Sequence, residues 1–309
     1  MKNYFSLFAF LTLLLGLAAC TNDTTPEQEP DNDMVPVRFS SKPYVDISTR
    51  ATGNDFQIGD EIGIFCVDTA TVHCDSVSDF DNYADNLRYR FNGESFRAVA
   101  DSIMQYRHNV NAFTYYFIYP FSYAAKAEFQ FTANRNQHIA GNYTKSDLAL
   151  QKLTTRDTDI LLQMKRMMAN VNIRVLGSNL LDYTMSAKIT NVFVTVNVDL
   201  NAQKVAIDST TSRKQVTFEQ YVKNSDVEAG FHALIAPQRL TSTQQISLTV
   251  GDTTYPIPLP NDWSAVNIPS GYQLTMTVEL EEETSGEIRL TYGGEALEPI
   301  PMHAPRKDY

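Results

Sequence analysis

The side chains best suited to acid–base or metal chemistry are spread along the whole chain. The five histidines are His73, His108, His138, His232 and His303. No two of them stand at the H-x-x-x-H spacing of a helical metal site, and the sequence contains no C-x-x-C pair. It also contains no G-x-S-x-G turn for a serine nucleophile and no glycine-rich phosphate loop. The sequence therefore predicts no catalytic residue, no metal site and no cofactor.

Acidic side chains leave one alternative open. The two carboxylates of a glycoside hydrolase meet only in the folded protein, so a search for motifs does not find them. The densest acidic cluster, "ELEEE" at 279–283, is better explained as a solvated strand end and loop. We therefore expect a protein that is not an enzyme.

Cys20 points to a different kind of chemistry. It follows Lys2 and a nearly continuous apolar run over residues 4–19, which is shorter than the roughly 20 residues that cross a bilayer. A positive residue, an apolar run and small residues at its end are typical of a secretory signal, here residues 1–19. The stretch "LAAC" (17–20) resembles the bacterial lipobox, in which cleavage leaves the cysteine as the lipidated first residue. The alternative is an ordinary signal peptide with a cysteine beside it by chance.

The other two cysteines, Cys66 and Cys74, flank the stretch "VDTATVH". In an oxidising compartment they are able to form a disulfide across this loop. The alternative is that both are small apolar residues next to a loop.

Residues 20–34 have the composition of a flexible acidic linker, because "TNDTTPEQEPDND" (21–33) contains no aromatic residue and cannot form a core. The acidic run and Thr21 resemble the sorting signals of surface lipoproteins in the outer membrane of Bacteroidetes. The whole chain carries a formal net charge of −11, and loss of Lys2 with the signal changes it to −12. An acidic surface disfavours nucleic acid as a partner.

Most of the chain after Phe56 alternates apolar and polar residues with a period of two. The stretches "ANVNIRV" (169–175), "VFVTVNVDL" (192–200) and "QLTMTVEL" (273–280) place different side chains on the two faces of a strand. Half-buried antiparallel strands produce this pattern. "FTYYFIYPF" (113–121) is apolar on both faces and predicts a central strand packed on two sides.

Helical periodicity is rare, and its best example is "DTDILLQMKRMM" (157–168). Many short strands separated by turn signals predict β-sandwiches. We therefore expect an all-β chain with two consecutive antiparallel β-sandwich domains of the transthyretin-like or Greek-key type. The polar stretch "QKLTTRDTD" (151–159) separates an aromatic-rich half from a Val/Thr-rich half, which predicts domains at 35–157 and 158–309.

The order of several short segments resembles the fimbrillin family, the two-domain subunits of Bacteroidetes type V pili. After the lipobox and the acidic linker come "VPVRFS" (35–40), "STRAT" (48–52), "FQIGDEIGIFCV" (56–67), "YYFIYPF" (115–121), "DTDILL" (157–162), "LIAPQRL" (234–240) and "IPSGYQLTMTVEL" (268–280). Together these segments extend over nearly the whole chain. The sequence departs from the family at Phe56, where many members have Trp, and in its Pro-rich tail.

The resemblance implies a role for Arg50. In this family the lipidated precursor reaches the cell surface, and an arginine-specific protease cuts after such a residue, here between Arg50 and Ala51. The cut removes the lipid and the first strand, "VPVRFSSKPYVDIS" (35–48). A strand of another pilus subunit then fills the vacated groove, and the polymer supports cell adhesion. Members that anchor the pilus keep their lipid, so the alternative is an uncut subunit held in the outer membrane.

A second class of function also fits a lipidated β-sandwich protein. A surface glycan-binding lipoprotein of a polysaccharide uptake system needs a platform of exposed aromatic residues. The single tryptophan, Trp263 in "LPNDWSAVNIPSGY", is the candidate for such a platform, although a packing role at a strand entry explains it as well.

Overall fold

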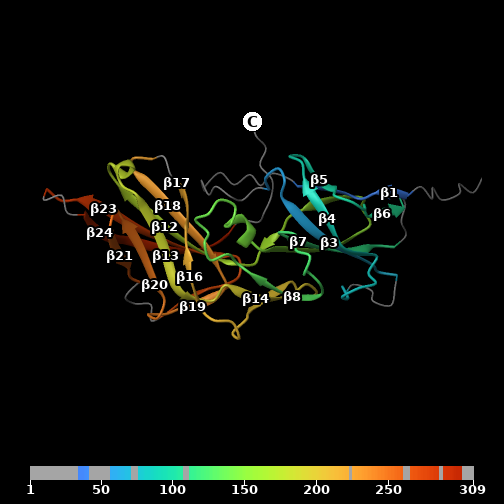
Figure 1. The fold of residues 1–309 in the computed structure, drawn as a ribbon. Helices are drawn as coiled ribbons and strands as arrows, with labels where there is room; N and C mark the ends of the chain where they lie inside the picture. The colour runs from blue at the N-terminus through green and yellow to red at the C-terminus, as the bar shows by residue number, and fades with distance from the viewer. Residues whose placement is uncertain are drawn as a thin grey trace, which may run out of the picture.

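A computed structural model describes residues 34–41, 56–70, 76–106, 111–222, 225–259, 265–284 and 288–300. These residues form strands and two short 3-10 helices, η1 (Thr144–Ser146) and η2 (Leu180–Asp182), with no α-helix among them. The all-β prediction is therefore confirmed. Figure 1 shows most strands gathered into two halves, with β1 and β3 to β7 at one end and β12, β13, β17, β18, β20, β21, β23 and β24 at the other.

The first half is built around one eight-stranded sheet. In spatial order its strands are β10 (Asp159–Leu162), β2 (Arg38–Ser41), β5 (Ser95–Ala98), β4 (Ala84–Phe91), β3 (Glu61–Asp68), β7 (Phe113–Tyr119), β9 (Ala149–Thr155) and β11 (Lys165–Arg166). All its ladders are antiparallel except the one between β2 and β10. A further pair, β1 (Met34–Pro36) with β6 (Met104–Tyr106), lies beside this sheet (Figure 1).

The first sheet curls until its two ends approach each other. Gln151 of β9 donates through Nε2 to the carbonyl oxygen of Leu161 in β10, at 3.3 Å. Its Oε1 accepts from the backbone N–H of Gln163, at 2.7 Å. The curled sheet encloses an aromatic core made by residues from β2, β3, β4, β5, β7 and β10.

Strand β7 is buried on both faces, as its sequence predicts. Tyr115 and Phe117 belong to the core inside the curled sheet. Tyr116 and Ile118 belong to a second core that continues into the other half of the molecule. A strand with no solvent-exposed face needs apolar or hydrogen-bonded side chains, and the one residue of β7 that is neither aromatic nor aliphatic, Thr114, has its Oγ1 2.9 Å from Thr154 Oγ1.

The second half contains two sheets packed face to face. The five-stranded sheet has the order β17 (Glu219–Val222), β18 (Glu228–Ile235), β12 (Ala169–Gly177), β23 (Tyr272–Glu282) and β24 (Ile288–Pro299). The four-stranded sheet has the order β16 (Lys214–Thr217), β13 (Met185–Val192), β20 (Gln245–Val250) and β21 (Thr253–Ile257). Alternate residues of both sheets, such as Ile173, Ile189 and Met276, fill the core between them.

A third sheet joins the two halves. Strand β8 (Glu128–Thr132) pairs with β14 (Thr195–Asp199), which pairs in turn with β15 (Lys204–Ile207). Figure 1 shows β8 and β14 side by side between the halves. Phe129 and Phe131 of β8 enter the core of the second half. A small sheet of β19 (Gln238–Leu240) and β22 (Val266–Ile268) completes the described strands.

The segment 157–168, with the best helical periodicity in the sequence, does not form a helix. It forms β10 and β11, which extend the first sheet at its two ends. Short strands here satisfy the backbone through pairing with β2 and β9, which outweighs a weak local preference for helix. Both strands lie on the C-terminal side of residue 157 yet pair within the first half. The domain ranges 35–157 and 158–309 stay a prediction.

Candidate functional site

The described part of the first strand segment, β2, is inserted between two other strands. On one side Phe39 pairs with Phe96 of β5 in an antiparallel ladder. On the other side Phe39 pairs with Ile160 of β10 in a parallel ladder. The start of the strand is also held by backbone hydrogen bonds, because the Val37 N–H donates to Ile103 O at 2.8 Å and the Arg38 N–H donates to Thr158 O at 2.7 Å.

Phe39 anchors this strand in the aromatic core. Its side chain has no exposed surface, and its ring lies 5.0 Å from Tyr89, 6.0 Å from Tyr115 and 5.5 Å from Phe117. All three contacts are edge-to-face, the arrangement that aromatic pairs prefer. Val37 is also buried, whereas Val35 in β1 is only partly buried. The strand therefore places one large ring and one smaller apolar side chain in a fitted groove.

The groove itself is made of rigid, water-excluded groups. The Tyr89 hydroxyl accepts a hydrogen bond from the Ile103 N–H at 2.8 Å, which fixes the segment beside β2. Burial raises the pKa of the Tyr89 hydroxyl, although its hydrogen bonds act in the opposite direction. Burial also raises the pKa of Tyr115, with Cys66 adding to the shift. Both hydroxyls of the groove walls thus stay neutral over the physiological pH range, and that of Tyr89 is hydrogen-bonded.

The residues predicted from sequence to carry function lie mostly outside the described parts of the chain. This applies to Cys20, Arg50, Ala51, Cys74 and Trp263. Lipidation of Cys20, processing between Arg50 and Ala51, and the role of Trp263 therefore stay predictions.

Cys66 is the exception, because it lies on β3 as a buried thiol. Burial raises the pKa of this thiol well above its usual value, and the Tyr115 hydroxyl makes a hydrogen bond that opposes the shift. Its pairing with Cys74 stays a prediction.

Arg50 nevertheless has a defined place along the chain. It lies between β2, which ends at Ser41, and Phe56, where the described chain resumes. Phe56 is buried and packs against Phe96 and Tyr119 at ring distances of 4.9 and 5.4 Å. The segment that contains Arg50 therefore connects two anchors in the same core.

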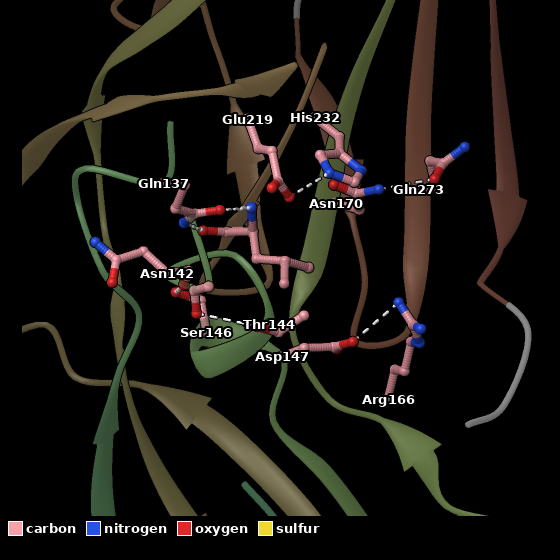
Figure 2. Close-up of polar contacts among 12 residues, drawn as sticks. Gln137, Asn142, Thr144, Ser146, Asp147, Arg166, Asn170, Glu219, His232 and Gln273 are labelled. Atoms are coloured by element: carbon pink, nitrogen blue, oxygen red, sulfur yellow. Dashed lines mark hydrogen bonds and ion pairs between the residues drawn. The ribbon is translucent and has the colours of Figure 1, made fainter. Parts of the chain in front are cut away.

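A second site, which is polar and was not predicted from the sequence, lies where the two halves meet. Figure 2 shows the ion pair between Asp147 and Arg166, with Nη1 and Oδ2 3.0 Å apart. Both side chains are almost completely buried. Arg166 belongs to β11 and follows closely after β10, so this pair lies near the chain that borders β2. A buried ion pair of residues 19 positions apart leaves no local pattern in the sequence.

Two further groups bind the halves together. Gln137 bridges the main chain of β18, since its Nε2 donates to Leu234 O at 2.7 Å and its Oε1 accepts from the Leu234 N–H at 2.8 Å (Figure 2). His232 lies flat against Tyr143, with ring centroids 3.6 Å apart. Its Nε2 is 3.1 Å from Glu219 (Figure 2). Burial lowers the pKa of His232, and the hydrogen bond to Glu219 opposes this shift.

The described residues hold no group of three or more His, Cys, Asp or Glu side chains placed to bind a metal ion. Across the same parts of the chain, no helix is long and apolar enough to cross a membrane. At β2 the structure shows a strand of the chain itself seated between β5 and β10.

Comparison with known protein families gives a match to the fimbrillin-like family model over residues 49–292. The chain belongs to the fimbrillin-like family. This family consists of fimbrial structural subunits, and its range takes in both halves of the molecule but begins after β2. No curated protein matches the chain.

Solved structures show the same fold. A candidate cell adhesion protein from Bacteroides ovatus is similar with a TM-score of 0.64 and 16% identity, over 87% of this chain and 98% of that one. Another from Bacteroides uniformis has a TM-score of 0.60 and 14% identity, over 88% and 99% of the two chains. A third from Bacteroides fragilis has a TM-score of 0.50 and 14% identity, over 85% and 98%. The fimbrillin-like fold is therefore shared well beyond recognisable sequence similarity.

Proposed function

We propose that this chain is a subunit of a surface fimbrium that polymerises by strand exchange and supports cell adhesion. It reaches the outer membrane as a lipoprotein, lipidated at Cys20. A protease then cuts between Arg50 and Ala51, which separates the lipid and β2 from the rest of the protein. Its partners are other fimbrial subunits, one of which fills the groove that β2 leaves.

The observation that carries the proposal is the position of β2 inside the first sheet. A strand paired on both edges leaves two unpaired edges when it is removed, and unpaired edges bind another strand readily. The groove also has a site for a large side chain, now filled by Phe39. Fimbrial family membership and the likeness to candidate adhesion proteins support assembly and adhesion.

The covalent connection to β3 contributes much of what keeps β2 in place. Val37, just before β2, and Phe39 within it are the buried apolar side chains here. Full burial of such residues contributes roughly 1.5–3 kcal/mol each. Once the connection is cut, β2 becomes a separate chain whose binding is opposed by the entropy of association, which favours its exchange for the strand of another subunit. A cut after Arg50 separates β2 from Phe56 without breaking any described strand.

The test is the N-terminus of the protein on the cell surface, determined by mass spectrometry, together with Arg50→Lys. The native protein is expected to begin at Ala51 and to form ladders of subunits that survive mild heating in detergent. The Arg50→Lys variant keeps the positive charge but resists an arginine-specific protease, so it is expected to keep lipidated Cys20 and to form no ladder. A native protein that still begins at lipidated Cys20 contradicts the proposal.

A further inference from the structure

Three arginines form a row across the outer face of the first sheet. Arg90 of β4 pairs with Arg97 of β5. Arg38 lies one residue before the Phe39–Phe96 pair of the antiparallel β2–β5 ladder, which places it beside Arg97. All three side chains are exposed. Their neighbours in the same strands, Phe39, Tyr89 and Phe96, are buried in the core. The row therefore lies on the solvent side of adjacent strands.

The charge of this row is only partly neutralised. At one end Glu61 contacts Arg90 at 2.6 Å and Arg88 at 3.7 Å. Among the described residues, no ion pair involves Arg38 or Arg97. Like charges directly opposite each other on neighbouring strands are destabilising. A concentration of arginines is also unexpected in a chain of net charge −11, so the row needs a reason other than stability.

An exposed aromatic side chain lies next to the row. Tyr123 is 82% exposed and makes an edge-to-face contact with Phe121, with ring centroids 4.8 Å apart. The guanidinium carbon of Arg88 lies 5.5 Å from the Phe121 ring centre and 5.7 Å from that of Tyr123. Arg88 and Arg90 lie on the same face of β4, so the aromatic pair and the arginines form one continuous surface.

The turn that presents Tyr123 is held firmly against the sheet. The Phe121 N–H donates to Glu61 O, and Asn86 donates through Nδ2 to Ser122 O, both at 2.8 Å. Asn86 has a positive φ of 45° and lies so close to Gly63 that a Cβ there would be 2.2 Å from Asn86 Oδ1. Gly63 is thus needed for this arrangement. The protein keeps a large ring in water at a fixed position, where it gains little from burial.

We propose that Arg90 and Arg97, together with Tyr123, form a docking surface for an acidic saccharide, which Arg38 extends only while β2 remains in place. Guanidinium groups bind carboxylates and sulfates through paired hydrogen bonds. The C–H edges of a sugar ring carry partial positive charge and pack on the negative face of an aromatic ring. The net negative charge of the chain disfavours long polyanions, which leaves short acidic glycans as the fitting ligands. This inference rests on the proposed function, since it names a ligand class for adhesion.

Binding is tested by isothermal titration calorimetry of the purified chain with three probes. These are a sulfated heparin tetrasaccharide, a carboxylated hyaluronan tetrasaccharide and neutral maltotetraose. The acidic probes are expected to bind and maltotetraose is not. Arg97→Gln is expected to weaken binding about tenfold, the effect of losing one charged hydrogen-bonding partner. Tyr123→Ala is expected to weaken it as well, whereas Arg239→Gln, at an exposed arginine of β19, is expected to change it less than twofold.

Three outcomes overturn the inference. One is that neither acidic probe binds, and another is that Arg239→Gln weakens binding as much as Arg97→Gln. The third is that a synthetic peptide of residues 23–33 binds in an Arg97-dependent way that Tyr123→Ala leaves unchanged, which assigns the surface to an acidic polypeptide. Because subunit ladders and the mature N-terminus are measured separately, normal ladders without saccharide binding contradict only this inference. Missing ladders contradict the proposed function.

Discussion

At the scale of single residues, Phe39 links the first strand to the stability of the first half. Its ring has no exposed surface and contacts three other aromatic rings. Phe39→Ala is expected to lower the free energy of unfolding by about 3–5 kcal/mol, because it removes buried contacts and leaves a cavity. Urea denaturation followed by fluorescence measures the change.

Phe80→Ala is the matched control for this prediction, because Phe80 is 70% exposed. It is expected to change the free energy of unfolding by less than about 0.5 kcal/mol. Equal effects of the two substitutions would show that β2 does not contribute through its anchor residue.

His232 gives the junction between the halves a pH dependence. Burial lowers its pKa in the folded protein from the usual value of 6.5. As the pH falls below about 6.5, the unfolded chain binds a proton at this residue while the folded chain does not, so acid destabilises the fold. Above that pH both states are neutral at His232 and the contribution vanishes.

His232→Gln is therefore expected to reduce the loss of unfolding free energy between pH 7 and pH 5. Denaturation curves at several pH values measure the slope for the native chain and the variant. His138→Gln, at an exposed histidine, serves as the control. An unchanged slope in His232→Gln would show that this residue does not titrate between the two states.

At the scale of strands, the proposed cut after Arg50 would affect the two strands that pair with β2. Without β2, strand β5 would keep one of its two partners, and β10 would keep no strand partner among the described residues. After treatment with an arginine-specific protease, amides of β5 and β10 are expected to exchange with deuterium faster. Strands β20 and β21, which lie in the other half, are the internal control.

Mass spectrometry of the exchanged peptides measures this effect. Amides of β10 that remain protected in the cut protein would show that β2 stays bound after processing.

The positions of several strands could be predicted from the sequence, but the strands with which they pair could not. Alternation over 169–175 and 273–280 identifies β12 and β23, and a fully apolar run identifies β7. Alternation marks a face but carries no information on the neighbour of a strand. Phe39 pairs with Ile160, more than a hundred residues away, so neither the groove of β2 nor the row of arginines beside it follows from local patterns.

At the scale of the whole molecule, residues of both halves form one sheet and one continuous core. β8 lies in a sheet with β14, and the core of the second half extends to Tyr116 and Ile118 of β7. A fragment that ends at residue 168 lacks these partners and exposes one face of β7. It is expected to show no cooperative thermal transition, whereas the full chain does. Calorimetry of both proteins tests this, and a cooperative transition in the fragment near that of the full chain contradicts it.

The pairing of β8 with β14 also affects the order in which the strands pair during folding. A chain that emerges from its N-terminus can join β3 to β4 and β5 early, because these strands are close in sequence. The first sheet is complete only after β10 has paired with β2, and β8 remains unpaired until β14 has been added. Distant pairings form slowly and leave strand edges open meanwhile. The edges of the first half therefore stay open until strands of the second half have formed, which makes this interval the one most prone to wrong pairing.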